Sequence, residues 1–157
     1  MQNISQRTVT FLIDKNKVLL GYKKTGFGSG NYLGIGGKVE DGEDNEEAAL
    51  REVKEEIKVD CLKLDKVGEL IFLFPENPTW TQQVHVYICK EWENIPQETD
   101  EIKPLWVSFS EIPLSQMWDD AQFWLPAILN GHSMKGSFTF HENLKVISLK
   151  LSEANFK

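Results

Sequence analysis

An acidic segment with a helical apolar stripe restricts what this chain can fold into more than any other feature of its sequence. Nine acidic residues fall between Glu40 and Glu56. From Glu46 to about Ile57 a helix is predicted, because Ala49, Val53 and Ile57 recur at four-residue spacing. Repulsion between so many like charges weakens a helix. The segment is therefore either a solvated helix face or a site that binds a cation.

The spacing of three glutamates favours the cation site. Glu52, Glu55 and Glu56 stand at i, i+3 and i+4, so they are expected to project from one helix face, away from the apolar stripe. Mg²⁺ suits this arrangement because it takes oxygen ligands and bridges carboxylates to substrate phosphates, and Mn²⁺ can substitute for it. Arg51 can reach Glu55 at i+4 and return to Glu43, which would fix the carboxylates in position. The segment thus predicts a magnesium site beside a bound polyphosphate.

The other residues predict a single domain, 1–157, of the α+β class. Its predicted strands are Val9–Ile13, Val18–Tyr22, Tyr32–Val39, Val67–Phe74, Val84–Cys89, Leu105–Phe109 and a closing hairpin of Gly136–Phe140 with Val146–Leu151. A second helix is predicted over Asp119–Leu129, and Asp44 and Asn45 are candidates to cap the first one. Strands and two helices in this mixed order favour an α/β/α sandwich with a mixed sheet.

Charge and composition narrow the classes of partner. The net charge of −7 argues against a nucleic-acid polymer, which usually demands a basic stripe, but not against a small anionic substrate carried with a cation. No apolar run approaches the roughly 18–20 residues of a membrane span, and no secretory signal is evident. Cys61 and Cys89 lack paired spacing, which suggests a reducing, cytoplasmic compartment. We expect a monomer that has no membrane partner.

In register, the acidic segment resembles the Nudix box of the Nudix hydrolase superfamily, G-x5-E-x7-R-E-U-x-E-E-x-G-U, in which U is an aliphatic residue. The positions that match are Gly37, Glu43, Arg51, Glu52, Val53, Glu55, Glu56 and Val59. Lys58 stands where the family has its second glycine, which normally ends the helix in a left-handed conformation. A lysine adopts that conformation at a cost of roughly 1 kcal/mol, so activity is expected to survive this departure.

This resemblance implies the Nudix α/β/α sandwich and an attack of water, assisted by Mg²⁺, on a phosphorus of a diphosphate linkage. The implied metal ligands are Glu52, Glu55, Glu56, Glu101 and the carbonyl of Gly36. Glu52 and Glu101 are the alternatives for the base that activates water. The implied catalytic set is Glu43, Arg51, Glu52, Glu56 and Glu101.

From about Thr8 to Leu151 the chain also resembles the MutT-type family that hydrolyses oxidised purine nucleoside triphosphates to the monophosphate and pyrophosphate. Landmarks of this similarity are GIGGKVEDGE (Gly34–Glu43), VGELIFLF (Val67–Phe74) and MWDDAQFWLP (Met117–Pro126). The residues that match the base pocket of that family are Thr8, Lys23, Phe27, Phe72, Phe74, Trp118, Asp119, Asp120, Trp124 and Phe140. Asp119 and Asp120 would address the base edge, one of them protonated if both are buried, and Lys23 would meet phosphate or sugar.

Departures in the pocket bear on the substrate. Leu33 replaces the asparagine of the family pocket, so we expect this substrate-binding position to discriminate purine edge atoms less strictly. Gln82 replaces a methionine, and the loop at Trp118 lacks one proline. The alternatives are therefore a Nudix enzyme for another modified nucleoside triphosphate, a dinucleoside polyphosphate or ADP-ribose, and an inactive nucleotide-binding regulator.

Simpler structural roles remain alternatives for several positions. Phe72 and Phe74 can belong to the core, and Trp118 can be ordinary helix packing. The pair Asp119 and Asp120 can be a helix cap. The three histidines show no metal-ligand spacing and are interpreted as structural.

Overall fold

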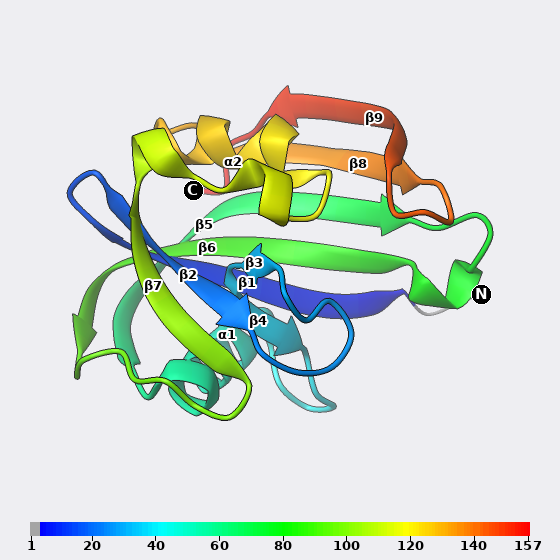
Figure 1. The fold of residues 1–157 in the computed structure, drawn as a ribbon. Coiled ribbons are helices and arrows are strands. Elements are labelled where there is room, and N and C mark those ends of the chain that lie inside the picture. Colours follow the sequence, from blue (N-terminus) through cyan, green and yellow to red (C-terminus); the bar gives the residue numbers. More distant parts are fainter. Residues whose placement is uncertain (1–3) are drawn as a thin grey trace.

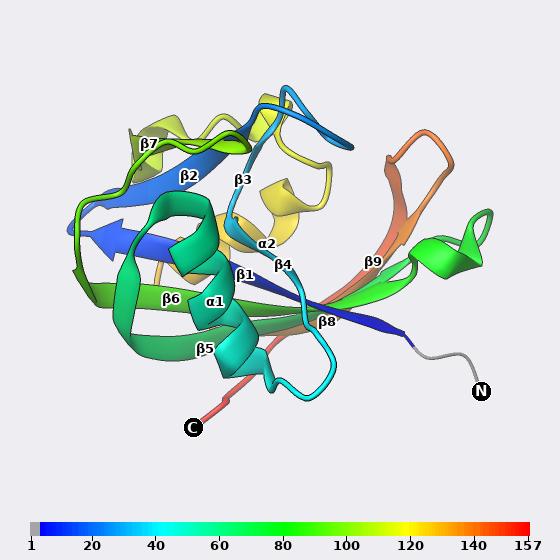
Figure 2. The ribbon, with the colours of Figure 1, turned by 90° about the horizontal axis from the view of Figure 1, so that it is seen from below.

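The computed structural model describes residues 4–157, which form one mixed β-sheet with an α-helix on either face (Figures 1 and 2). The hydrogen-bonded strand order is β3-β2-β1-β6-β5-β8-β9, with β4 paired to β1 and β7 paired to β2. The pairs β1–β6 and β5–β8 are parallel and the other pairs are antiparallel. The strands are β1 (Ser5–Asp14), β2 (Lys17–Lys23), β3 (Tyr32–Leu33), β4 (Ile35–Lys38), β5 (Asp60–Leu73), β6 (Gln82–Glu93), β7 (Ile102–Ser108), β8 (Met134–Phe140) and β9 (Val146–Glu153). The predicted sandwich with a mixed sheet is confirmed.

Alternation along β1 separates two hydrophobic layers. Phe11 faces the helix α2 (Ala121–Leu129), where it packs in one core cluster with Trp124. The next residue, Leu12, faces α1 (Asn45–Ile57) and packs in a second cluster with Val53. Successive side chains of a strand point to opposite faces of its sheet, so this central strand serves both layers. The two helices consequently lie on opposite faces, as Figure 2 shows.

The predicted first helix is confirmed, and both of its ends are capped. The Asp44 carboxylate accepts a hydrogen bond from the Glu47 N–H at 2.8 Å, and the Glu47 carboxylate accepts one from the Asp44 N–H at 3.2 Å. This reciprocal pair is a capping box. At the other end, Lys58 adopts the left-handed conformation, with φ 63 and ψ 32, and its N–H donates to the Lys54 carbonyl. The lysine ends the helix as expected for the family glycine.

Several elements differ in extent from the prediction. β5 begins at Asp60 rather than Val67, because it pairs with β6 along its whole length through register shifts. The predicted strand 32–39 is divided into β3 and β4, which pair with β2 and β1 respectively. At the break, a Cβ on Gly34 would lie only 2.4 Å from the Val9 side chain. α2 begins at Ala121 rather than Asp119.

Three short 3-10 turns complete the fold: η1 (Pro78–Trp80), η2 (Phe109–Glu111) and η3 (Leu114–Gln116). Neither α-helix within residues 4–157 has the length and apolar character needed to cross a membrane.

Candidate active site

The C-terminal half of α1 carries the predicted metal ligands in three different environments. Glu56 is buried, with 8% of its surface exposed, and counts among the residues that α1 packs against the core. The Glu52 side chain is 14% exposed and the Glu55 side chain 60% exposed. The expectation that all three project away from the apolar stripe is therefore wrong for Glu56. Its backbone position borders the stripe, and its side chain is buried in the folded chain.

Glu56 shares its surroundings with two carboxylates and a lysine. Burial raises the pKa of Glu56 to about 9, and a hydrogen bond with the Glu52 carboxyl and the charges of Glu52 and Glu101 act in the same direction. The Lys23 ammonium acts in the opposite direction and lowers this pKa. Tertiary structure thus brings Lys23, at the end of β2, and Glu101, just before β7, into the neighbourhood of α1.

Arg51 organises the outer side of this cluster. Its guanidinium donates two hydrogen bonds of 2.8 Å to the Glu43 carboxylate, one of 2.8 Å to Glu52 and one of 3.2 Å to Glu55. A further bond of 3.0 Å reaches the Lys38 carbonyl on β4. The hydrogen bonds that Arg51 donates lower the pKa of Glu43 to about 2, and the bonds to Glu43 and Glu52 raise the pKa of Arg51. The predicted contacts of Arg51 with Glu55 and Glu43 are both present.

Two adjacent glycines let β4 pass close to β1 on one side and to α1 on the other. A Cβ on Gly36 would lie 1.8 Å from the Thr8 carbonyl oxygen, so β1 and β4 can pair here only without a side chain. A Cβ on Gly37 would lie 2.6 Å from a carboxylate oxygen of Glu52. The backbone of β4 therefore lies directly against the glutamate cluster. The carbonyl of Gly36, the residue that precedes Gly37, stays a predicted metal ligand.

The donor set of this cluster fits a hard divalent cation. The Glu52 carboxyl raises the pKa of Glu56, and a cation between the two groups would relieve the repulsion of their charges. Oxygen donors of this type are the ligands that Mg²⁺ prefers. Within residues 4–157, however, Glu52, Glu55 and Glu56 do not form a group whose ligand atoms all lie within 4.8 Å. Glu55 is instead turned toward Arg51, which donates a hydrogen bond of 3.2 Å to its carboxylate.

A cavity of about 490 Å³ lies between the sheet and the loops that lead to α2. Its walls combine aromatic side chains with few polar ones, as is typical of ligand pockets. Nine predicted substrate-binding residues line it, namely Thr8, Lys23, Phe27, Leu33, Phe72, Phe74, Trp118, Asp120 and Trp124. Lys23 and Gly37 line this cavity and also lie near the glutamate cluster, through Glu56 and Glu52 respectively. The cavity and the cluster are therefore two ends of one site.

The two adjacent aspartates differ sharply. Asp120 is buried, lines the cavity and accepts a hydrogen bond of 2.7 Å from the Trp124 indole, while its Oδ1 has no partner among the described residues. Burial raises the pKa of Asp120 to about 6, and the charge of Asp119 adds to this effect. Asp119 instead accepts hydrogen bonds from the Gln122 side chain at 2.9 Å and the Val146 N–H at 2.8 Å.

The predicted pair is thus divided, and Asp119 does not line the cavity. Phe140 is also outside its lining, although its ring stacks on that of Phe74 at a centroid distance of 4.9 Å. Neither aspartate caps α2 through its side chain in the usual way, since the structure shows no side-chain cap bond at Asp120. Phe72 and Phe74 belong to the hydrophobic core and also line the cavity, so the core role and the substrate-binding role predicted for them are compatible.

Sequence reasoning missed Arg7 and Trp80, which also line the cavity. Arg7 lies two residues before Val9 on the same face of β1, and the alternation of that strand is the signal that would have found it. Its Nε is buried without a partner, and it forms no ion pair with any described residue. Trp80 belongs to the irregular loop between β5 and β6. No periodic signal marks such a position.

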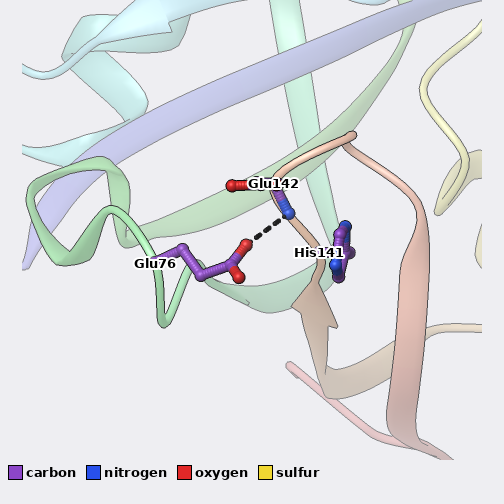
Figure 3. A group of neighbouring side chains, drawn as sticks. All are labelled: Glu76, His141 and Glu142. Carbon is purple, nitrogen blue, oxygen red and sulfur yellow. Dashed lines mark hydrogen bonds between the residues drawn. The ribbon is translucent and has the colours of Figure 1, made fainter.

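A second group of potential metal ligands lies on the surface, away from α1. Glu76, His141 and Glu142 are exposed and their ligand atoms lie within 4.8 Å of one another (Figure 3). The Glu76 carboxylate accepts a hydrogen bond of 2.8 Å from the Glu142 N–H. Through this bond the loop after β5 is joined to the turn between β8 and β9. This hydrogen bond explains why the three side chains lie close together without a bound ion.

Known proteins are similar to this chain in sequence and in fold. The NUDIX domain family matches residues 5–127. An oxidized purine nucleoside triphosphate hydrolase of Danio rerio is 38% identical over 146 residues, which cover 93% of each protein. The protein of the same name in Mus musculus is 34% identical over 148 residues, or 94% of each. A crystal structure of a MutT protein from Bacillus halodurans superposes with a TM-score of 0.82 at 22% identity, covering 95% of this chain and 98% of that one.

Proposed function

The chain belongs to the NUDIX domain family of hydrolases, and on this premise we propose that it hydrolyses oxidised purine nucleoside triphosphates to the monophosphate and pyrophosphate. One observation carries the proposal. The cavity with aromatic walls and the carboxylates of α1 share Lys23 and Gly37 at their junction. A nucleotide bound across this junction would have its base among aromatic rings and its phosphates beside the carboxylates.

In this proposal Glu52 and Glu56 would hold Mg²⁺, with Mn²⁺ as a substitute. Glu55 would join them if it exchanged its contact with Arg51, and Glu101 and the Gly36 carbonyl would be further ligands. When bound, the ion would neutralise phosphate charge and orient the reacting phosphate. Glu52 and Glu101 both remain candidates for the base, because both lie beside Glu56. Arg51 and Glu43, which are hydrogen-bonded to each other, would keep the metal-binding carboxylates in position.

The preference for an oxidised base is supported by Asp120. A purine that gains an oxo group also gains a ring N–H, and a buried carboxylate with an unpartnered oxygen matches such a donor. Leu33 lines the same cavity and offers no hydrogen bond. Recognition of the base edge would therefore depend mainly on Asp120. This arrangement would accept more than one oxidised purine.

The proposal extends to the organisation of the protein. We expect one catalytic domain over residues 1–157, acting as a monomer on a small nucleotide and not on a nucleic-acid polymer or a membrane. Both cysteines are free thiols, which is compatible with a cytoplasmic location. Elution volume in size-exclusion chromatography with light scattering would test the monomer.

The decisive test is to measure kcat/KM with Mg²⁺ for 8-oxo-dGTP, 2-oxo-dATP, dGTP and dATP side by side, with detection of pyrophosphate. We expect the oxidised nucleotides to be preferred by at least about tenfold, the effect of one buried polar contact. A preference for unmodified nucleotides, ADP-ribose or dinucleoside polyphosphates would contradict the proposed substrate. Binding without any turnover would contradict the proposed reaction.

A further inference from the structure

Five aromatic rings at the cavity form a closed circuit of contacts. Phe27 contacts Trp80 at a centroid distance of 5.9 Å, and Trp80 contacts Phe74 at 5.8 Å. Phe74 stacks on Phe140 at 4.9 Å, Phe140 contacts Trp118 at 6.4 Å, and Trp118 returns to Phe27 at 5.8 Å. All of these rings except Phe140 line the cavity. Four contacting aromatic rings therefore form part of the cavity wall, against which a flat base could bind.

Trp80 and Phe27 are the exposed members of this circuit. Phe27 is 62% exposed and Trp80 is 42% exposed, whereas Phe74 is 4% exposed and forms part of the core. The two exposed rings come from different loops, one between β2 and β3 and the other between β5 and β6. Because they line the cavity and also meet solvent, they lie at its opening. A ligand that enters the cavity would cover the apolar surface that both rings now expose.

The backbone around Trp80 is held in place by short-range hydrogen bonds. The Trp80 N–H donates to the Asn77 carbonyl at 2.9 Å, and the Asn77 N–H donates to the Phe74 carbonyl at 2.9 Å. The Glu76 carboxylate ties the same loop to the turn between β8 and β9 through the Glu142 N–H (Figure 3). The loop therefore presents the indole to the cavity in a defined position. Preorganisation of this kind reduces the ordering that binding would otherwise require.

We infer that Trp80 is a substrate-contacting residue that provides an aromatic surface for the purine base and so determines how well this chain binds purine nucleotides. The inference rests on the proposed function. Stacking depends on the area of the flat ring, so a purine gains more than a pyrimidine from an indole. The phosphates would lie at the other end of the site, beside Lys23 and Glu56. Trp80 would consequently affect KM and leave kcat nearly unchanged.

Glu76 acts as a positioning residue for Trp80. Its carboxylate accepts a hydrogen bond from the Glu142 N–H, and Glu76 itself does not line the cavity. Its removal would free the loop and weaken the contribution of Trp80. A glutamine retains an acceptor oxygen for the same N–H, so the Glu76→Gln variant should behave like the wild type.

The test is to compare Trp80→Ala and Trp80→Phe with the wild type, using 8-oxo-dGTP as substrate. Trp80→Ala should raise KM roughly tenfold, the effect of one base–aromatic stack, with kcat within about twofold. Trp80→Phe keeps a ring and should lie within about threefold in KM. Ile95→Ala removes another exposed apolar side chain and serves as the matched control with unchanged kinetics. Glu76→Ala should raise KM by a smaller factor, about threefold, and Glu76→Gln should restore it.

An unchanged KM in Trp80→Ala, or a loss confined to kcat, would overturn the inference. If the alanine variant does not fold, judged by circular dichroism, Trp80→Phe decides through tryptophan fluorescence. Titration with 8-oxo-dGMP should quench the wild type more than the phenylalanine variant, and equal quenching would overturn the inference. The proposed function fails separately, if the wild type shows no preference for oxidised purines. The effect of Trp80→Ala on KM can then still be measured with whichever purine nucleotide is hydrolysed.

Discussion

The two ends of the site are built in opposite ways. The carboxylate end takes its main residues from Gly37 to Glu56, and ion pairs of Arg51 hold it together. The cavity end takes residues from β1, β5, β6, the loop after β2 and the segment that leads into α2, and side-chain packing holds it together. Charges at fixed helical spacing are readable in a linear sequence. A pocket of aromatic rings exists only after distant segments have met.

The largest expected loss of activity comes from a substitution at the carboxylate end of the site. Glu56→Gln should lower kcat on the order of a thousandfold, because it removes a ligand charge from the buried centre of the cluster. Glu55→Gln is the matched control on the same helix, since its carboxylate is exposed and contacts Arg51. We expect a smaller loss there. Rates with Mg²⁺ and 8-oxo-dGTP would measure both, and equal losses would contradict the difference seen between the two positions.

The two adjacent glycines of β4 should respond differently to the same substitution, because one faces the carboxylate end of the site and the other faces β1. Gly37→Ala should fold but lose roughly 10- to 100-fold in kcat/KM, because the new Cβ displaces the Glu52 carboxylate. Gly36→Ala should instead lose stability, by about 1–3 kcal/mol, because its Cβ meets the rigid Thr8 carbonyl. Thermal unfolding and kinetics on both variants would separate these outcomes. A Gly37→Ala enzyme with full activity would show that Glu52 need not stay where it is.

The cavity end should respond to pH through Asp120. Its pKa rises from 3.8 to about 6 on folding, so the folded state binds this proton more tightly than the unfolded state. The contribution of Asp120 to stability is therefore fully present below about pH 4 and is lost as the pH rises through 6. The loss is at most about 3 kcal/mol, since one pKa unit corresponds to roughly 1.4 kcal/mol. In the Asp120→Asn variant, the free energy of unfolding measured with urea should no longer change with pH in this way between pH 4 and 6. If the pH dependence is the same as in the wild type, Asp120 is not the group responsible for it.

The smallest effect concerns the end of α1, outside both halves of the site. Lys58→Gly should stabilise the protein by about 1 kcal/mol, because glycine adopts the left-handed conformation without strain. The melting temperature should rise by roughly 2–4 °C. Activity should be unchanged, which calorimetry and kinetics on the same preparation would establish. A fall in kcat would mean that this helix end also positions Glu55 or Glu56.

Prediction from sequence succeeded where neighbouring residues decide the outcome. The helix over Asn45–Ile57, its cap at Asp44 and the contacts of Arg51 with Glu43 and Glu55 all follow from local spacing. It was less successful where burial decides. Glu56 and Asp120 are covered by packing between segments far apart in the chain, and no local pattern distinguishes them from their less buried neighbours Glu55 and Asp119.

The amino-acid sequence by itself determined the acidic helix, the match to the Nudix box and the fold class, because each depends on periodicity or on spacing within one segment. Only the tertiary structure decided which carboxylate of α1 is buried, which aspartate lines the cavity and that Trp80 completes the aromatic circuit. The physical reason is that desolvation and ring packing arise from contacts between β1, β5, the loops and the helices. Such contacts form only when the whole sheet has assembled.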